Sequence, residues 1–139
     1  MNIVVDCSFI MSSILPDENE DKIENIFYGI AKNQYKVYVP SIFYLECTNV
    51  LLSSLNSKRI AQDSFEEYTE LLSLLPITLD KFCTTPESLY SIGNLAKKYN
   101  LTSYDASYLD VAMRMEASVA TLDRELVKVC RNAKIELLV

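Results

Sequence analysis

Short segments rich in β-branched residues alternate with longer segments of helical apolar spacing, and this alternation constrains the fold more than any other feature. The β-branched segments fall at residues 2–6, 36–40, 77–79, 118–121 and 135–139. Such runs are typical of strands that are buried on both faces. A regular exchange of strands and helices predicts an α/β fold, with a central, mostly parallel β-sheet flanked by α-helices on both faces.

The segments between the predicted strands have the apolar spacing of helices with one buried side. The predicted helices cover residues 21–32, 41–55, 60–75, 85–99, 103–116 and 123–131. Ser41 and Ser103 are expected to cap two of them, and Pro16 interrupts the segment after the first strand. The chain has 139 residues and no linker or internal repeat, which predicts a single domain over residues 1–139.

The composition excludes several kinds of site. The chain contains no histidine, so Ser-His-Asp and Cys-His catalysis are excluded. It has only two glycines and none of the glycine-rich loops that bind dinucleotides or nucleoside triphosphates. The cysteines lack the close pairing of zinc sites and are expected to be reduced, buried thiols. They are Cys7, Cys47, Cys83 and Cys130.

No apolar run is long enough to cross a bilayer, and the N-terminal residues lack the basic start of a secretory signal. A cytoplasmic protein without a membrane partner is therefore expected.

Four acidic residues occupy corresponding places in the predicted fold. Asp6 ends the first strand, and Asp123 follows the fourth. Glu46 lies one turn into the helix after the second strand, and Asp105 lies in the first turn of the helix before the fourth. Sites in open parallel sheets form beyond the carboxyl ends of the strands. The four carboxylates are therefore expected to meet at one edge of the sheet.

Each acid also has a structural interpretation. Asp6 can accept hydrogen bonds from amides where the strand ends, and Asp123 can cap a helix. Asp105 can stabilise its helix, because a negative charge in the first turn interacts favourably with the helix dipole. This kind of explanation is weakest for Glu46, which lies in a helix that looks mostly buried. An unpaired carboxylate there is costly or takes up a proton. One cation site explains all four acids together.

Clustered carboxylates without histidine or paired cysteine suit hard cations. The prediction is a site for Mg²⁺ or Mn²⁺ that hydrolyses phosphate esters with water activated by the metal. The predicted ligands are Asp6, Glu46, Asp105 and Asp123. Ser8 and Thr121 are expected beside them as hydrogen-bond donors, and Asn49 lies one turn beyond Glu46 on the same face.

Three residues near the acids in the sequence are given no role. Asp110 is about 140° around the helix from Asp105, so it is assigned to another face. Cys7 and Cys47 directly follow two of the acids. Neighbouring residues on a strand or helix point in different directions, so both thiols are expected to point away from the site.

The net charge of −6 is unfavourable for a nucleic-acid partner, but the charges are unevenly distributed. Up to Gly93 there are 6 basic and 13 acidic residues, and from Asn94 onward there are 7 basic and 6 acidic ones. Four basic residues recur every three or four positions, either as a solvated helix face or as a strip that contacts phosphates. They are Arg124, Lys128, Arg131 and Lys134, of which Arg124 and Lys128 are the candidate RNA contacts.

Four blocks occur in the order IVVDCSFIMSSILPDE, IFYLECTNVLL, TSYDASYLDVAM and ASVATLDRELVKV. Together they resemble the PIN-domain ribonucleases, and most of all the VapC-like toxins of type II toxin–antitoxin pairs. The resemblance implies a PIN-like α/β domain that needs Mg²⁺ or Mn²⁺ and cleaves RNA as an endonuclease. The acidic quartet of the family falls on Asp6, Glu46, Asp105 and Asp123, and its small hydroxyl residues on Ser8 and Thr121.

The resemblance further implies a homodimer and inhibition by an antitoxin protein. Two alternatives stay open: a PIN nuclease of RNA processing or decay that is not a toxin, and a catalytically idle PIN-like module that binds RNA. An aspartyl-phosphate on Asp6 is disfavoured, because Ser8 stands where phosphatases of that kind need a second aspartate.

Overall fold

A four-stranded parallel sheet forms the centre of the molecule. The computed structural model describes residues 1–15 and 20–139, so the predicted break at Pro16 lies outside the described residues. The strands are β1 (Asn2–Val5), β2 (Lys36–Pro40), β3 (Ile77–Asp80) and β4 (Ser118–Ala120). Their order in the sheet is β3-β2-β1-β4, and all three pairings are parallel. The predicted α/β class is confirmed.

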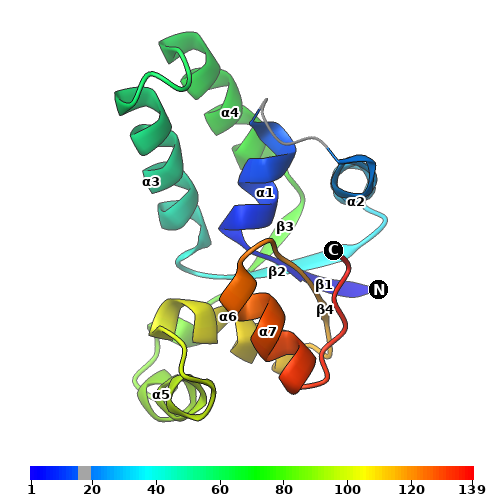
Figure 1. The fold of residues 1–139 in the computed structure, drawn as a ribbon, viewed down its shortest axis with the longest axis vertical. Helices are drawn as coiled ribbons and strands as arrows, with labels where there is room; N and C mark the ends of the chain where they lie inside the picture. The colour runs from blue at the N-terminus through cyan, green and yellow to red at the C-terminus, as the bar shows by residue number, and fades with distance from the viewer. Residues whose placement is uncertain (16–19) are drawn as a thin grey trace.

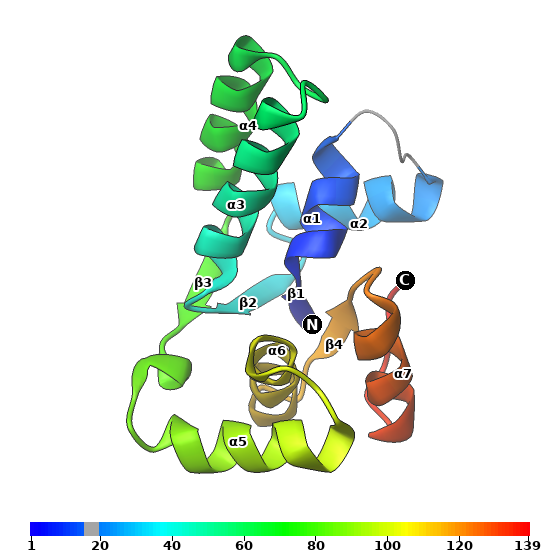
Figure 2. The ribbon, with the colours of Figure 1, turned by 60° about the vertical axis from the view of Figure 1, so that its left-hand side comes forward.

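Helices cover both faces of this sheet, as the sequence predicts (Figure 1). One face carries α1 (Cys7–Ile14), α2 (Asp21–Ala31), α3 (Phe43–Asn56) and α4 (Gln62–Leu74). The other carries α5 (Ser88–Tyr99), α6 (Ser103–Arg114) and α7 (Arg124–Asn132), with a 3-10 turn η1 (Phe82–Thr84) before α5. Figure 2 shows the sheet between the two groups of helices.

The central strand β1 anchors the core. Its residues Ile3, Val4 and Val5 have no exposed surface, because β2 and β4 pair with them on either side and helices cover both faces. The β-branched composition of this strand suits burial on both faces. Asp6, the next residue, is therefore held at the carboxyl edge of the most buried strand.

Helix α1 was not expected from the sequence. It begins directly after Asp6, whose side chain accepts a hydrogen bond from the backbone N–H of Phe9 and so caps the helix. The segment CSFIMSSI is poor in strong helix formers, so propensity alone does not indicate a helix there.

Two predicted helix caps are wrong. Ser41 instead donates to the carbonyl oxygen of Asp80 at 3.0 Å, and α3 begins without a side-chain cap. In α6 the capping residue is Thr102, not Ser103, because the Thr102 hydroxyl accepts from the backbone N–H of Asp105 at 3.2 Å.

The predicted last strand over 135–139 is reduced to one bridge between Leu137 and Val119. Two backbone hydrogen bonds accompany this bridge: the N–H of Val119 donates to the Glu136 carbonyl oxygen at 2.8 Å, and the N–H of Leu138 donates to the Val119 carbonyl oxygen at 2.9 Å. No helix in the described part of the chain has the length and apolarity needed to cross a bilayer.

Candidate active site

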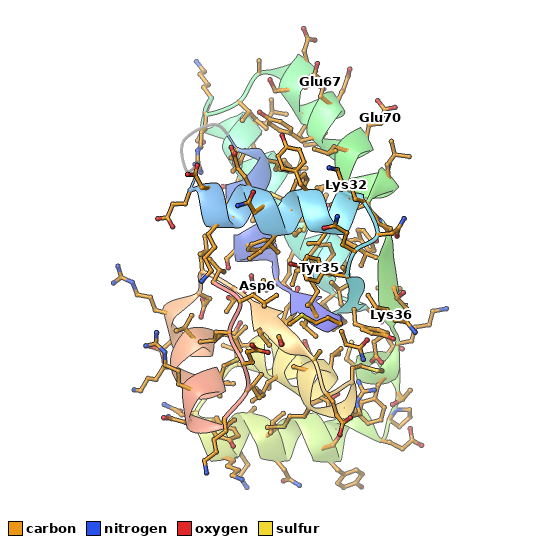
Figure 3. The ribbon with its side chains drawn as sticks, turned by 90° about the vertical axis from the view of Figure 1, so that its right-hand side faces the viewer. Asp6, Lys32, Tyr35, Lys36, Glu67 and Glu70 are labelled. Carbon is orange, nitrogen blue, oxygen red and sulfur yellow. The ribbon has the colours of Figure 1, made fainter. Side chains whose placement is uncertain are left out.

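All four predicted acids line one cavity of about 370 Å³ at the carboxyl edge of the sheet. Asp6 follows β1, Asp123 follows β4, and Glu46 and Asp105 lie in the first turns of α3 and α6. Figure 3 places Asp6 near the middle of the molecule, between the helices of the two faces. The cavity is also lined by Cys7, Ser8, Met11, Asn49, Val50 and Tyr108.

Asp6 is held by hydrogen bonds on both carboxylate oxygens. Its Oδ1 accepts from the Ser8 hydroxyl at 2.6 Å and from the N–H of Phe9 at 3.0 Å. Its Oδ2 accepts from the Thr121 hydroxyl. A carboxylate offers about four lone-pair positions, so these bonds leave one free on Oδ2. The side chain, 6% exposed, therefore has a fixed orientation and one oxygen available to a ligand.

Ser8 and Thr121 connect the end of β1 to the start of α7. The Ser8 hydroxyl accepts from the N–H of Leu122 at 2.9 Å, and the Thr121 hydroxyl accepts from the N–H of Asp123 at 3.0 Å. Asp123 caps α7 by accepting from the N–H of Leu126 at 2.9 Å. Asp6 and Asp123 thus both have the structural role predicted for them, since each accepts a hydrogen bond from a backbone N–H at the start of a helix. Both also line the acidic cavity.

Glu46 has a partner that sequence reasoning missed. The hydroxyl of Tyr108, on α6, donates to Glu46 Oε1 at 2.7 Å. The expectation that α3 is mostly buried is wrong, since Leu45 is 73% exposed and Glu46 is itself half-buried. The available signal was that Tyr108 lies three residues beyond Asp105, on the same face of one helix.

The structure separates Asp110 from the other acids. Asp110 Oδ2 accepts from Arg114 Nε at 2.9 Å, and the same guanidinium makes two hydrogen bonds, of 2.8 and 3.0 Å, to Asp80. Asp110 lies outside the acidic cavity, in keeping with its assignment to another face.

The expectation that both nearby thiols point away is wrong for Cys7, which lines the cavity because α1 begins there and turns its first residue inward. Cys47 lines a different cavity, between α3 and α4.

Asp6, Glu46 and Asp105 each have a raised pKa. Burial is the main cause of the raised pKa of Asp6, opposed by its hydrogen bonds from Ser8, Thr121 and Phe9. Burial also raises the pKa of Glu46, where the Tyr108 hydroxyl opposes it, and the pKa of Asp105. Neighbouring carboxylates raise all three further.

These residues fit a hard divalent cation by their chemistry. Carboxylate oxygens are the ligands that Mg²⁺ and Mn²⁺ prefer, and a cation would offset both the burial and the mutual repulsion of the acids. In residues 1–15 and 20–139, no three His, Cys, Asp or Glu side chains are already arranged to hold an ion, so binding would require the carboxylates to turn toward one another.

The fold and the cavity define an α/β domain with an acidic site at the carboxyl edge of a parallel sheet. The family model described as the PIN domain matches residues 3–132, and the chain belongs to this family of nucleases. No curated protein matches the sequence.

Three solved structures have a similar fold. PAE2754 from Pyrobaculum aerophilum is 22% identical, with a TM-score of 0.67 over 92% of this chain and 78% of that one. VapBC2 from Rickettsia felis, bound to a DNA fragment from its promoter, is 15% identical, with a TM-score of 0.68 over 99% and 97%. FitAcB from Neisseria gonorrhoeae is 17% identical, with a TM-score of 0.65 over 97% and 95%.

Proposed function

We propose that this protein is an endoribonuclease that depends on Mg²⁺ or Mn²⁺. The observation that supports the proposal is the meeting of four carboxylates in one cavity of a PIN-domain chain. A bound cation would neutralise charge on the phosphate and make an attacking water more acidic. The chain itself has no histidine to act as a general base.

In this proposal the four acids have related but separate tasks. Asp6 offers Oδ2 in an orientation that Ser8 and Thr121 fix. Glu46 and Asp105 approach from two different helices and complete the principal cation site. Asp123 completes this site or holds a second ion from the start of α7. Tyr108 positions Glu46 by donating to Oε1 and leaves its second oxygen for a ligand.

The substitution Asp6→Asn tests the proposal. Asparagine caps helices about as well as aspartate, so α1 should persist while one ligand charge is lost. We expect cleavage of single-stranded RNA with Mn²⁺ to fall at least about 100-fold, since loss of such a group removes several kcal/mol of transition-state stabilisation.

Asp63→Asn is the matched control, because Asp63 is exposed on α4 and does not line the acidic cavity. The control should cleave at the wild-type rate. Full activity of Asp6→Asn in nuclease-free preparations would rule the proposal out.

We also propose that the chain is the toxin of a toxin–antitoxin pair, with an antitoxin protein as partner, and that it forms a homodimer. The support is the resemblance to VapC-like toxins and the similarity in fold to VapBC2 and FitAcB. A short reading frame directly upstream, encoding a DNA-binding N-terminus, is the expected finding. Co-expression of that product should suppress cleavage, and light scattering should give twice the mass of 15.8 kDa for the chain alone.

A further inference from the structure

A further cavity, of about 320 Å³, lies on the outer face of α7. Three of its lining residues are cations and, among the residues described, no carboxylate lines it. This is unusual for a chain with a net charge of −6. The lining residues are Leu122, Arg124, Val127, Lys128, Arg131 and Asn132. We call this the basic cavity.

The cations of the basic cavity share one face of a firmly held helix. Arg124, Lys128 and Arg131 follow the i, i+4, i+7 spacing and are all exposed. The opposite face of α7 is fixed in the core by Leu126 and Cys130, which are 1% and 0% exposed. Figure 3 shows nitrogen-tipped side chains reaching outward from the ribbon of α7, at the lower left.

These cations are also available to a ligand. Within the described ranges, the side chains of Arg124, Lys128 and Arg131 make no salt bridge and no hydrogen bond. Arg114, by contrast, is engaged by both Asp80 and Asp110. A set of unpaired cations in a hollow attracts anions, and most strongly a polyanion.

The basic cavity adjoins the acidic one. Asp123 lines the acidic cavity, and its two neighbours in the chain, Leu122 and Arg124, line the basic cavity. Two residues of extended chain span at most about 7 Å, so residues 122–124 bring the walls of the two cavities together over a short length of backbone. A strand with a phosphate at the acids can therefore place its neighbouring phosphates over α7.

We propose that the basic cavity binds the phosphodiester groups of single-stranded RNA that flank the bond to be cleaved, with Arg131 and Asn132 extending the contact beyond Arg124 and Lys128. This inference rests on the proposed ribonuclease function and adds the direction in which the substrate leaves the acidic cavity. The anionic backbone is read here without regard to base sequence.

The test compares two double variants that each remove two positive charges. Lys128→Gln with Arg131→Gln changes the basic cavity. Lys97→Gln with Lys98→Gln changes an exposed pair at the end of α5. Both are made in the Asp6→Asn protein for binding of a fluorescent single-stranded oligoribonucleotide, and in the wild type for cleavage.

For the basic-cavity variant we expect at least a tenfold weaker affinity at low salt. The slope of log affinity against log salt concentration should become shallower by about 1.4, since each phosphate contact on a single strand contributes about 0.7. KM should rise with kcat unchanged. The α5 variant should match its parent in all three measurements.

The outcomes separate the two proposals. If the wild type cleaves RNA but both double variants behave alike, the proposal that the basic cavity binds substrate is overturned. Its cations then face solvent or contact a protein partner. If the wild type neither cleaves nor binds RNA, the ribonuclease function itself fails, and the inference fails with it.

Discussion

At the scale of single residues, the bond between Tyr108 and Glu46 joins α6 to α3 across the acidic cavity. The hydroxyl donates to a charged acceptor at 2.7 Å, and it lowers a Glu46 pKa that burial raises. A hydrogen bond to a charged group contributes about 1.5–3 kcal/mol. Tyr108 therefore influences both the position of Glu46 and its readiness to ionise.

Tyr108→Phe should move the acid limb of the pH profile of kcat/KM to higher pH, because Glu46 loses the donor that favours its charged form. Activity at neutral pH should fall about tenfold, equivalent to about 1.4 kcal/mol. Tyr104→Phe, on the exposed side of the same helix, is the control and should leave the profile unchanged. If the pH profile of Tyr108→Phe is not shifted, Tyr108 does not position Glu46 for catalysis.

Asp123 has two tasks that substitution can separate. Asn caps a helix as well as Asp does, whereas Ala costs about 1 kcal/mol at that position. Asp123→Asn should thus lose most of its RNA cleavage without losing urea stability, and Asp123→Ala should lose both. If Asp123→Asn cleaves normally, the residue serves only as the cap of α7.

At the scale of elements, Arg114 connects the end of α6 to the end of β3. Its guanidinium bonds to Asp80 and Asp110 and lies 4.8 Å from the centre of the Phe82 ring in η1. Arg114 holds the pKa of Asp80 below its usual value. A carboxyl with a lowered pKa adds stability above its unfolded pKa and loses it as the pH falls through the folded value.

Arg114→Met should therefore destabilise the fold most at neutral pH and least in acid. Because the Arg114 side chain is 34% exposed, the loss is expected to be about 1 kcal/mol in urea unfolding. Lys22→Met removes an exposed charge from α2 and should have little effect at either pH. If Arg114→Met lowers the free energy of unfolding equally at both pH values, Arg114 stabilises the fold through packing alone.

The elements also show where sequence patterns stop being informative. Parallel strands and amphipathic helices follow from short-range spacing, and they were predicted to within a few residues. Helix α1 depends instead on Asp6 as its cap, and its own residues give little helical signal. The Tyr108–Glu46 bond joins residues 62 positions apart, and no periodicity within either helix indicates which residues of the other it will face.

At the scale of the whole molecule, the acidic cavity should make stability depend on pH and on cations. The pKa of Asp6, Glu46 and Asp105 is raised in the folded chain. A carboxyl with a raised pKa stabilises the fold fully below its unfolded pKa, and this contribution is lost as the pH rises through the folded value. Without divalent ions, the cavity therefore opposes folding at neutral pH.

Glu46→Gln should accordingly melt at a higher temperature than the wild type at pH 8 in EDTA. This difference in melting temperature should disappear at pH 4. Mn²⁺ should raise the melting temperature of the wild type at pH 8 and raise that of Glu46→Gln much less, because binding to the folded state alone stabilises it. Equal melting curves with and without Mn²⁺ would speak against the cation site.

The pairing of β1 with β4 brings the beginning of the chain against a strand near its end. The backbone N–H of Asp6 donates to the carbonyl oxygen of Ala120, and its side chain accepts from the Thr121 hydroxyl. Asp123 follows both of these partners in the chain. Asp6 and Thr121 are 115 positions apart, so during synthesis β1 leaves the ribosome well before these partners. A nascent chain therefore lacks the assembled acidic cavity until residues 118–123 have emerged and β4 has paired with β1.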